Sequence, residues 1–230
     1  DTVKDALAAR KKNAKLVVTG CMVQTHHDVL KTEFPDIDYL LGSGDVEGIL
    51  HAVQSTQQGA MISNARSYLE VGEVPRKVST PKHFAYLKIA EGCRKRCAYC
   101  IIPEIKGPLK SKAPEQIMKE FQLLLSQGAK EIILIAQDLG DYGKDRGSKR
   151  LEGLLSLLNE LLFVKQDFWL RLLYLYPDEI TEDLVKLIKS DKRICPYLDM
   201  PIQHVNNEML KAMHRATSKE DIIRTITTLR

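Results

Sequence analysis

The sequence predicts an α/β protein with two parts, a small N-terminal domain around a parallel sheet and a larger domain of repeated strand–helix units. Short apolar runs with strand character alternate with amphipathic stretches of helical period over most of the chain. This alternation is lost between about Gln57 and Lys82, where Gly, Ser, Pro and scattered charges accumulate. We therefore expect one domain at residues 1–58, a linker at 59–82 and a second domain at 83–230.

The N-terminal domain alternates helices and strands, which favours a parallel sheet because helical crossovers join parallel neighbours. The expected elements are a helix through Lys12, a strand at Leu16–Thr19, a helix to about Glu33, a strand at Tyr39–Leu41 and a helix from Asp45.

The second domain repeats the same alternation from Phe84 onward. The expected elements are strand Phe84–Ala90, helix Pro114–Ser126, strand Glu131–Ala136, helix Leu151–Leu162, strand Trp169–Leu175, helix Thr181–Ser190, strand Tyr197–Met200 and two further helical stretches. Such repeats indicate either an open doubly wound sheet or a closed or partial (βα) barrel. The last helical stretch, Ser218–Arg230, has no stop signal, so we expect a fragment of a longer protein.

Polar residues follow each expected strand of the second domain, which favours the barrel. These groups are Glu91 with a cysteine-rich loop, Gln137-Asp138, Tyr176-Pro177-Asp178 and Gln203-His204. Barrel enzymes gather their active-site residues at the carboxyl ends of the strands. We therefore expect these groups to meet at one site.

Three of the five cysteines, Cys93, Cys97 and Cys100, lie within one loop at C-x3-C-x2-C spacing. An odd, crowded set of thiols favours metal binding over disulfides. Three thiolates can hold three irons of a four-iron, four-sulfur cluster and leave the fourth iron open to S-adenosylmethionine. A structural zinc site is the alternative, with Cys195 or a histidine as the fourth ligand.

Two further features of the cysteines and their neighbours have plainer interpretations. The run Arg94-Lys95-Arg96 is expected to be mainly solvated, although positive charge there would stabilise a reduced, anionic cluster. Cys195 precedes a proline and has no partner spacing, so we expect a structural role for it.

Four stretches together resemble the radical S-adenosylmethionine methylthiotransferases. They are Tyr86-Leu87-Lys88-Ile89-Ala90-Glu91-Gly92-Cys93, Ile101-Ile102-Pro103 with Lys106-Gly107, Ile135-Ala136-Gln137-Asp138 with Asp141-Tyr142-Gly143, and Leu198-Asp199-Met200-Pro201-Ile202-Gln203-His204. The second and last are most similar to the members that modify a ribosomal protein. The resemblance implies a partial N-terminal domain, then a radical S-adenosylmethionine partial (βα) barrel that is incomplete at its C-terminal end.

The resemblance also implies the site residues. Cys93, Cys97 and Cys100 would hold the cluster that binds S-adenosylmethionine. Thr19-Gly20-Cys21-Met22 resembles the last ligand of a second four-iron cluster, so the full-length enzyme would carry two and this chain one complete site. Contacts to S-adenosylmethionine are expected from Tyr99, Gln137, Asp138, Arg171 and Gln203, and contacts to substrate from Asp199 and His204.

Each of these residues also has an ordinary interpretation. Cys21 on its own is expected to be a small buried apolar residue. Polar residues such as Gln137 or Gln203 at strand ends often cap helices or anchor loops. Arg171 lies in an apolar strand, where alternation places it either inside the barrel or outside under a helix.

The implied reaction adds a methylthio group to the β-carbon of an aspartate in a small-subunit ribosomal protein, with an electron donor as a further partner. The net charge of +4 is compatible with ribosome or RNA contact. The alternatives are a tRNA adenosine methylthiotransferase and a non-catalytic iron–sulfur or zinc scaffold that docks on the ribosome. The chain lacks a membrane-length apolar run and a signal-peptide pattern, so we expect a cytoplasmic protein.

Overall fold

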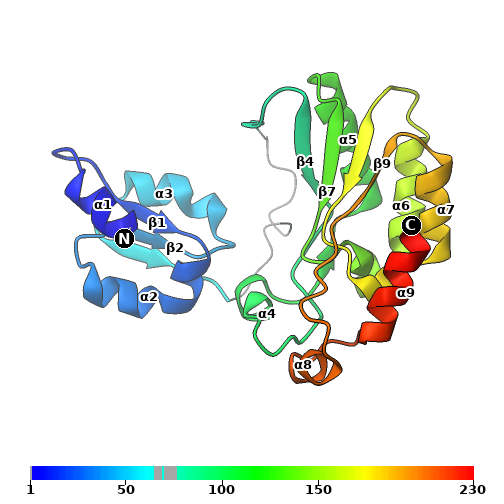
Figure 1. Ribbon diagram of the computed structural model, residues 1–230. Helices are drawn as coiled ribbons and strands as arrows, with labels where there is room; N and C mark the ends of the chain where they lie inside the picture. The colour runs from blue at the N-terminus through cyan, green and yellow to red at the C-terminus, as the bar shows by residue number, and fades with distance from the viewer. Residues whose placement is uncertain (1, 65–68, 70–76) are drawn as a thin grey trace. The chain divides into compact units, whose positions relative to one another are not determined.

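The computed structural model describes residues 2–64, 69 and 77–230. The chain forms two compact units (Figure 1). The first contains the N-terminal sheet and its helices, together with the segment Ile101–Gly107. The second contains the cysteine-rich loop and the remaining strands and helices through Arg230.

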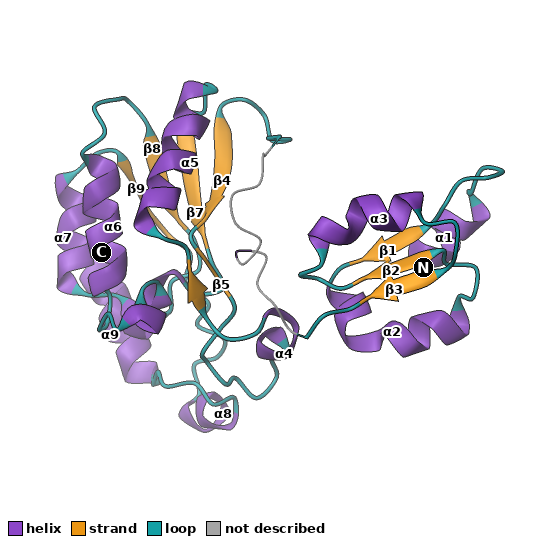
Figure 2. Cartoon of the chain, turned by 180° about the vertical axis from the view of Figure 1, so that it is seen from behind, coloured by secondary structure: helices purple, strands orange, loops and turns teal. Residues whose placement is uncertain are grey.

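The first unit is a parallel three-stranded sheet in the order β1-β2-β3, with helices on both faces (Figure 2). Its strands are β1 Val17–Thr19, β2 Tyr39–Leu41 and β3 Gly59–Met61. Its helices are α1 Thr2–Ala8, α2 Cys21–Glu33, the 3₁₀ turn η1 Val46–Gly48, α3 Ile49–Gln54 and α4 Ile102–Lys106.

Side-chain alternation along β2 separates the two faces of this sheet. Leu40 packs with Val23 and Leu30 of α2 on one face. Tyr39 and Leu41 pack with Ala52 of α3 on the other. All of these side chains are buried. The sheet is therefore covered on both sides, as parallel sheets usually are.

Strand β3 lies at the start of the segment that we expected to be a linker. The three residues of β3 show no hydrophobic periodicity in the sequence. Their backbone nevertheless pairs with that of β2, with Gly59 opposite Tyr39. A Cβ atom at Gly59 would approach the Tyr39 ring to 2.6 Å, so the close pairing depends on glycine. Residues 65–68 and 70–76 of the expected linker lie outside the described residues, and the boundaries of the linker stay a prediction.

The second unit is built on a parallel four-stranded sheet in the order β4-β7-β8-β9. Its strands are β4 Phe84–Lys88, β7 Glu131–Ile135, β8 Trp169–Leu172 and β9 Ile194–Leu198, with a short antiparallel pair of β5 Ala90–Glu91 and β6 Lys110–Ser111. Its helices are α5 Pro114–Ser126, α6 Glu152–Leu162, α7 Glu182–Ser190, α8 Asn207–Ala212 and α9 Lys219–Leu229, with 3₁₀ turns η3 Leu139–Asp141, η4 Lys144–Arg146 and η5 Pro177–Glu179.

The structure confirms the predicted α/β class, and most element positions agree with the sequence. The main shift is β9, which begins at Ile194 rather than at Tyr197. Pro196 interrupts the strand pattern in the sequence. A proline is tolerated there because β9 is the last strand in the sheet order, where one side of its backbone needs no partner.

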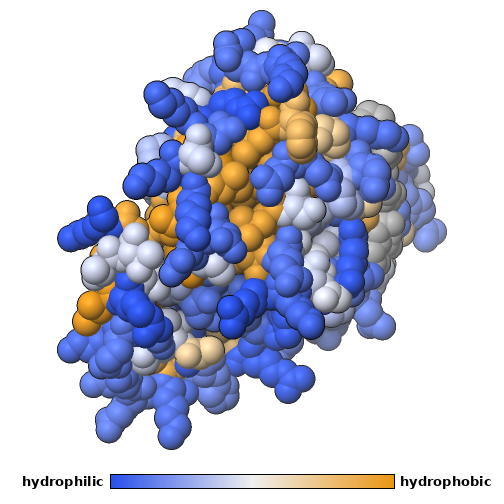
Figure 3. Space-filling model, turned by 90° about the vertical axis from the view of Figure 1, so that its right-hand side faces the viewer, coloured by the Kyte–Doolittle hydropathy of each residue, from blue (hydrophilic) through white to orange (hydrophobic). Residues whose placement is uncertain are grey.

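An apolar groove of about 670 Å³ lies beside β9, between α7 and the end of α9. Its apolar lining includes Val185, Ile188, Ile194 and Leu198. Figure 3 shows apolar side chains gathered in a hollow on one side of the molecule.

The main core lies between the sheet and helices α5, α6 and α7. Phe121 of α5 is completely buried and meets Phe168 edge to face, with ring centroids 5.0 Å apart. On the other face of the sheet, Tyr86, Trp169 and Tyr197 are exposed. One face is therefore covered by helices, whereas the other presents aromatic and polar groups.

Replacing Phe121 by Ala should lower the free energy of unfolding by about 3–5 kcal/mol, because the change leaves a cavity and removes the contact to Phe168. Urea unfolding followed by circular dichroism measures this loss. Phe163→Ala is the control, since that ring is 76% exposed and its removal should change stability by less than about 0.5 kcal/mol. Equal losses in the two variants would contradict the assigned core.

Candidate functional site

The three expected cluster ligands lie in one loop, Gly92–Cys100, which we call the cysteine loop. It follows β5 directly and begins with Gly92 in the left-handed region, at φ 78°. The Ala98 amide donates to the Met213 carbonyl over 3.1 Å, and the Cys100 amide donates to the Cys97 carbonyl over 3.0 Å. The loop is therefore tied both to itself and to the end of α8.

The three cysteines are free thiols of intermediate exposure. The Cys93 sulfur accepts a hydrogen bond from the Lys95 amide at 3.4 Å, and the Cys97 sulfur accepts one from Arg215 at the same distance. Burial raises the pKa of the Cys93 thiol, and the nearby carboxylate of Asp141 raises it further. A metal must therefore displace a proton to bind this sulfur.

The spread of the sulfurs bears on which metal group fits. Among the described residues, Asp138, Asp141 and Glu179 have ligand atoms within 4.8 Å of one another, and the three cysteines form no such group. A single zinc ion needs all its ligands close to one centre. A four-iron cluster takes each thiolate on a different iron, so its thiolates do not have to converge on one point.

A buried ion-pair network attaches the cysteine loop to the carboxyl ends of the strands. The Lys95 ammonium lies 2.9 Å from Asp138 and 3.3 Å from Glu179. The Lys144 ammonium lies 2.8 Å from Asp141 and 2.8 Å from Glu179. With Asp178, 3.9 Å from Lys95, four carboxylates share two ammonium groups, and the described acidic triad already has lysines as its cations.

Burial and charge act in opposite directions in this network. Burial lowers the pKa of Lys95, but the carboxylates of Asp138, Asp178 and Glu179 together outweigh it, and the pKa rises above its ordinary value. Burial raises the pKa of Asp138 to about 6, although Lys95 opposes the shift. Our expectation that Lys95 is solvated is therefore wrong: its side chain is 20% exposed because partners far along the chain surround it.

Tyr176 lies between two cations at this end of the sheet. The Lys95 ammonium and the Arg215 guanidinium each lie 4.0 Å from the centroid of its ring. Arg215 is buried and donates to the Pro201 carbonyl over 2.6 Å as well as to Cys97. Sequence analysis missed Arg215, because it follows the short helix α8 and no spacing links it to the cysteines.

Three residues expected to contact S-adenosylmethionine lie near the cysteine loop or the end of β7. Tyr99 is 54% exposed and interacts with the Cys97 thiol. Asp138 is engaged by Lys95 and also accepts from the Gly140 amide at 3.0 Å. The Gln137 side-chain oxygen is buried and has no hydrogen-bond partner among the described residues, so it can accept from a bound molecule.

The remaining expected residues lie elsewhere or keep their roles as predictions. Arg171 bonds through Nε to Glu131 at the amino end of β7, so it does not join the cysteine-loop network. Gln203 is exposed with φ 62°. His204 accepts through Nδ1 from the Asn206 amide at 2.9 Å, and the Asp199 carbonyl accepts from Leu175 at 3.0 Å.

Cys21 belongs to the first unit and is exposed at the start of α2, directly after Gly20 at the end of β1. It is therefore not the small buried residue of the ordinary interpretation. Cys195, by contrast, is buried, which agrees with the structural role that we expected.

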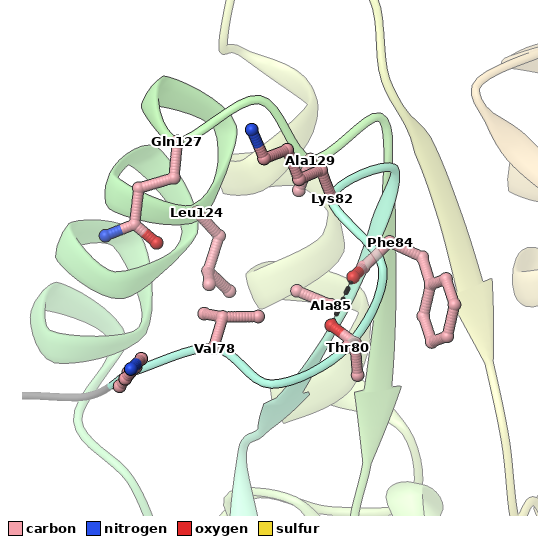
Figure 4. Close-up of a pocket in the computed structure, with 9 residues that line it drawn as sticks. Val78, Thr80, Lys82, Phe84, Ala85, Leu124, Gln127 and Ala129 are labelled. Carbon is pink, nitrogen blue, oxygen red and sulfur yellow. Dashed lines mark hydrogen bonds between the residues drawn. The ribbon is translucent and has the colours of Figure 1, made fainter.

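Two cavities lie at opposite ends of the second sheet. One of about 360 Å³ is lined by the cysteine loop, Tyr176 and Arg215. The other, of about 410 Å³, lies at the amino end of β4, where Thr80 donates to the Phe84 carbonyl over 2.6 Å (Figure 4). Barrel chemistry takes place at the carboxyl ends of strands, so we assign the candidate site to the first cavity.

The model of the radical SAM superfamily matches residues 87–230, which is more than half of the chain. The chain belongs to this superfamily. The match includes the cysteine loop and every strand of the second sheet except the first residues of β4.

Relatives with curated names match the whole chain. It is 77% identical over 230 residues to the "Ribosomal protein uS12 methylthiotransferase RimO" of Protochlamydia amoebophila, and covers 48% of that protein. It is 57% identical to the protein of the same name from Chlamydia caviae, covering 50% of it. The chain thus spans about half the length of the curated relatives it matches.

Solved structures with a similar fold include the radical S-adenosylmethionine methyltransferase TsrM from Kitasatospora setae. The structure with cobalamin and a [4Fe-4S] cluster has a TM-score of 0.64 and 15% identity, and the alignment covers 94% of this chain and 49% of that one. The structure with tryptophan and aza-SAM has a TM-score of 0.65 and 16% identity, over 94% and 48%. At this identity the likeness shows the fold.

The raised pKa of Asp138 predicts a pH-dependent stability. The folded-state pKa of Asp138, about 6, exceeds its ordinary value of 3.8. Protonation of this carboxyl therefore stabilises the folded chain. The stabilisation is fully present below pH 3.8 and is lost as the pH rises through 6. Between about pH 4 and 7, the wild type should therefore lose about 2–3 kcal/mol of stability relative to Asp138→Asn.

Urea unfolding of both chains at the two pH values measures this difference. The control is Asp183→Asn, which makes the same change at an exposed carboxylate. A stability difference between wild type and Asp138→Asn that stays constant with pH would contradict the assigned shift.

Proposed function

We propose that this chain is part of a radical S-adenosylmethionine enzyme that methylthiolates the β-carbon of an aspartate in ribosomal protein uS12. The main support is the 77% identity over all 230 residues to a protein named for this activity. The relatives named RimO include the protein of Dictyoglomus thermophilum, at 41% identity over 95% of the chain. The cysteine loop and its cavity provide the chemistry that such an enzyme needs.

Cys93, Cys97 and Cys100 would hold a four-iron, four-sulfur cluster, with S-adenosylmethionine on its open iron. When bound, such a cluster supplies the electron for reductive cleavage of S-adenosylmethionine. Three free thiols in one loop, half-buried and without a disulfide, match the donor set that this group requires.

The surrounding residues would hold the loop and the cofactor. Arg215 donates to the Cys97 sulfur and places positive charge beside an anionic cluster. The unpartnered Gln137 oxygen supplies an acceptor at the end of β7. Gln203 and Arg171 stay candidates for S-adenosylmethionine contacts.

The remaining assignments are parts of the same proposal. Asp199 and His204, which follow β9, would face the substrate. Cys21 would be one ligand of a second four-iron cluster in the full-length protein, and its free thiol at a strand end, which is exposed, is compatible with this role. We also propose an electron donor, a contact with the ribosome or its RNA, and a cytoplasmic location. No described helix is both long and apolar enough to span a bilayer.

The full-length protein should be reconstituted with iron and sulfide under anaerobic conditions, then incubated with S-adenosylmethionine, a reductant and either uS12 or tRNA. Mass spectrometry should detect a methylthio addition on an aspartate of uS12 and none on tRNA. Modification of tRNA alone would reject the proposed substrate. Failure of a fully loaded cluster to cleave S-adenosylmethionine would instead favour a non-catalytic scaffold.

Replacing Cys97 by Ala should abolish both cluster binding and S-adenosylmethionine cleavage, because a methyl group cannot ligate iron. Iron analysis and the visible absorption spectrum of this 230-residue chain measure the loss. Cys195→Ala is the matched control, since that thiol is buried, and it should load iron like the wild type. A normal spectrum in Cys97→Ala would refute the ligand assignment.

A further inference from the structure

We propose that Tyr176 is a positioning residue: its ring, held between Lys95 and Arg215, fixes the cysteine loop and the cation that donates to Cys97. This inference rests on the proposed cluster at that loop, and it assigns a role to a residue outside the ligand set. The ring projects from the end of β8, whereas the two cations come from the cysteine loop and from the segment after α8.

We infer that the two cations lie on opposite faces of the ring. Each lies 4.0 Å from the same ring centroid, and two cationic groups cannot share one face at that distance without collision and repulsion. The ring faces carry the negative lobes of the aromatic quadrupole, so both contacts are attractive. Tyr176 therefore separates two like charges and binds both.

Both residues that carry these cations also contact a cysteine. Lys95 lies between Cys93 and Cys97 in the loop, and its backbone amide donates to the Cys93 sulfur at 3.4 Å. The Arg215 guanidinium donates to the Cys97 sulfur at 3.4 Å from a position 118 residues further along the chain. A displaced ring would remove one contact from each of these two residues.

The partners of the two cations differ. Lys95 has Asp138 and Glu179 on its other side. Arg215 bonds to the Pro201 carbonyl, to the Cys97 sulfur and to the hydroxyl of Tyr176 itself. The ring is therefore the main aromatic support for a guanidinium whose direction determines the hydrogen bond to sulfur. Hydrogen bonds to the sulfurs of a cluster, and positive charge near it, raise its reduction potential.

The first test uses hydrogen exchange of the 230-residue chain without metal. In Tyr176→Leu, the amide of Ala98, which bonds to the Met213 carbonyl, should exchange roughly tenfold faster than in the wild type, because two cation–π contacts are lost. Tyr176→Phe keeps both ring faces and loses only the hydroxyl contact with Arg215, so its Ala98 amide should exchange at a rate closer to that of the wild type than to that of Tyr176→Leu.

The matched control is Tyr197→Leu, which removes another ring that faces a guanidinium, that of Arg171 at 5.2 Å. It should leave exchange in the cysteine loop unchanged. If Tyr176→Leu loses its far-ultraviolet circular dichroism, Tyr176→Met is measured in its place. Wild-type exchange at Ala98 in a folded Leu or Met variant would overturn the proposal.

The second test measures the midpoint potential of the reconstituted cluster by redox titration followed by electron paramagnetic resonance. Tyr176→Leu should shift the potential to a more negative value, Tyr176→Phe should shift it less, and Tyr197→Leu should match the wild type. An unchanged potential in Tyr176→Leu, or an equal shift in Tyr197→Leu, would overturn the positioning role.

The two tests also separate this inference from the proposed function. A wild-type chain that loads no cluster would reject the proposed function, while the exchange experiment would still decide whether Tyr176 fixes the loop. A wild type that loads normally, with variants that match it in exchange and potential, would reject the role of Tyr176 alone.

Discussion

The attachment of the cysteine loop to the sheet depends on the burial of one positive charge. Lys95 carries its ammonium group from the loop into a pocket formed by Asp138, Glu179 and the ring of Tyr176. These partners follow β7 and β8, whose carboxyl ends meet at one edge because the strands are parallel. The cysteine loop has no helix or strand of its own, and its position is set by contacts with residues that follow β7 and β8.

Such a network is costly, since each buried ion loses hydration that its partners only partly replace. The cost is visible at Asp138, whose pKa rises to about 6 despite the nearby Lys95. A packed apolar cluster would stabilise the fold at least as well. We infer that the charges serve mainly to place Lys95 and its neighbours, because ion pairs have directional requirements that apolar contacts lack.

In the first unit, hydrogen bonds likewise connect the loops that follow neighbouring strands. Gln24 of α2 accepts from the Ser43 amide at 3.1 Å, after β2, and donates to the Ser63 carbonyl over 2.8 Å, after β3. Asp45 is buried and accepts from the Ser63 amide at 3.0 Å. These bonds organise the loops at the edge of the sheet where Cys21 also lies, directly after β1.

The sequence by itself determined the α/β class, most strand and helix positions and the three clustered thiols, because these depend on periodicity and spacing between near neighbours. The sequence did not predict β3, because these three residues form a strand only by pairing with β2. It also misplaced the start of β9, because Pro196 interrupts the strand pattern and is tolerated only in an edge strand.

Only the tertiary structure decided what surrounds the thiols. Lys95 and Glu179 are 84 residues apart, and Cys97 and Arg215 are 118 apart, so no local pattern pairs them. Whether Lys95 is solvated or buried depends on the packing of distant strand ends. The physical reason is that charge and aromatic contacts act through space, whereas a sequence motif records neighbours along the chain.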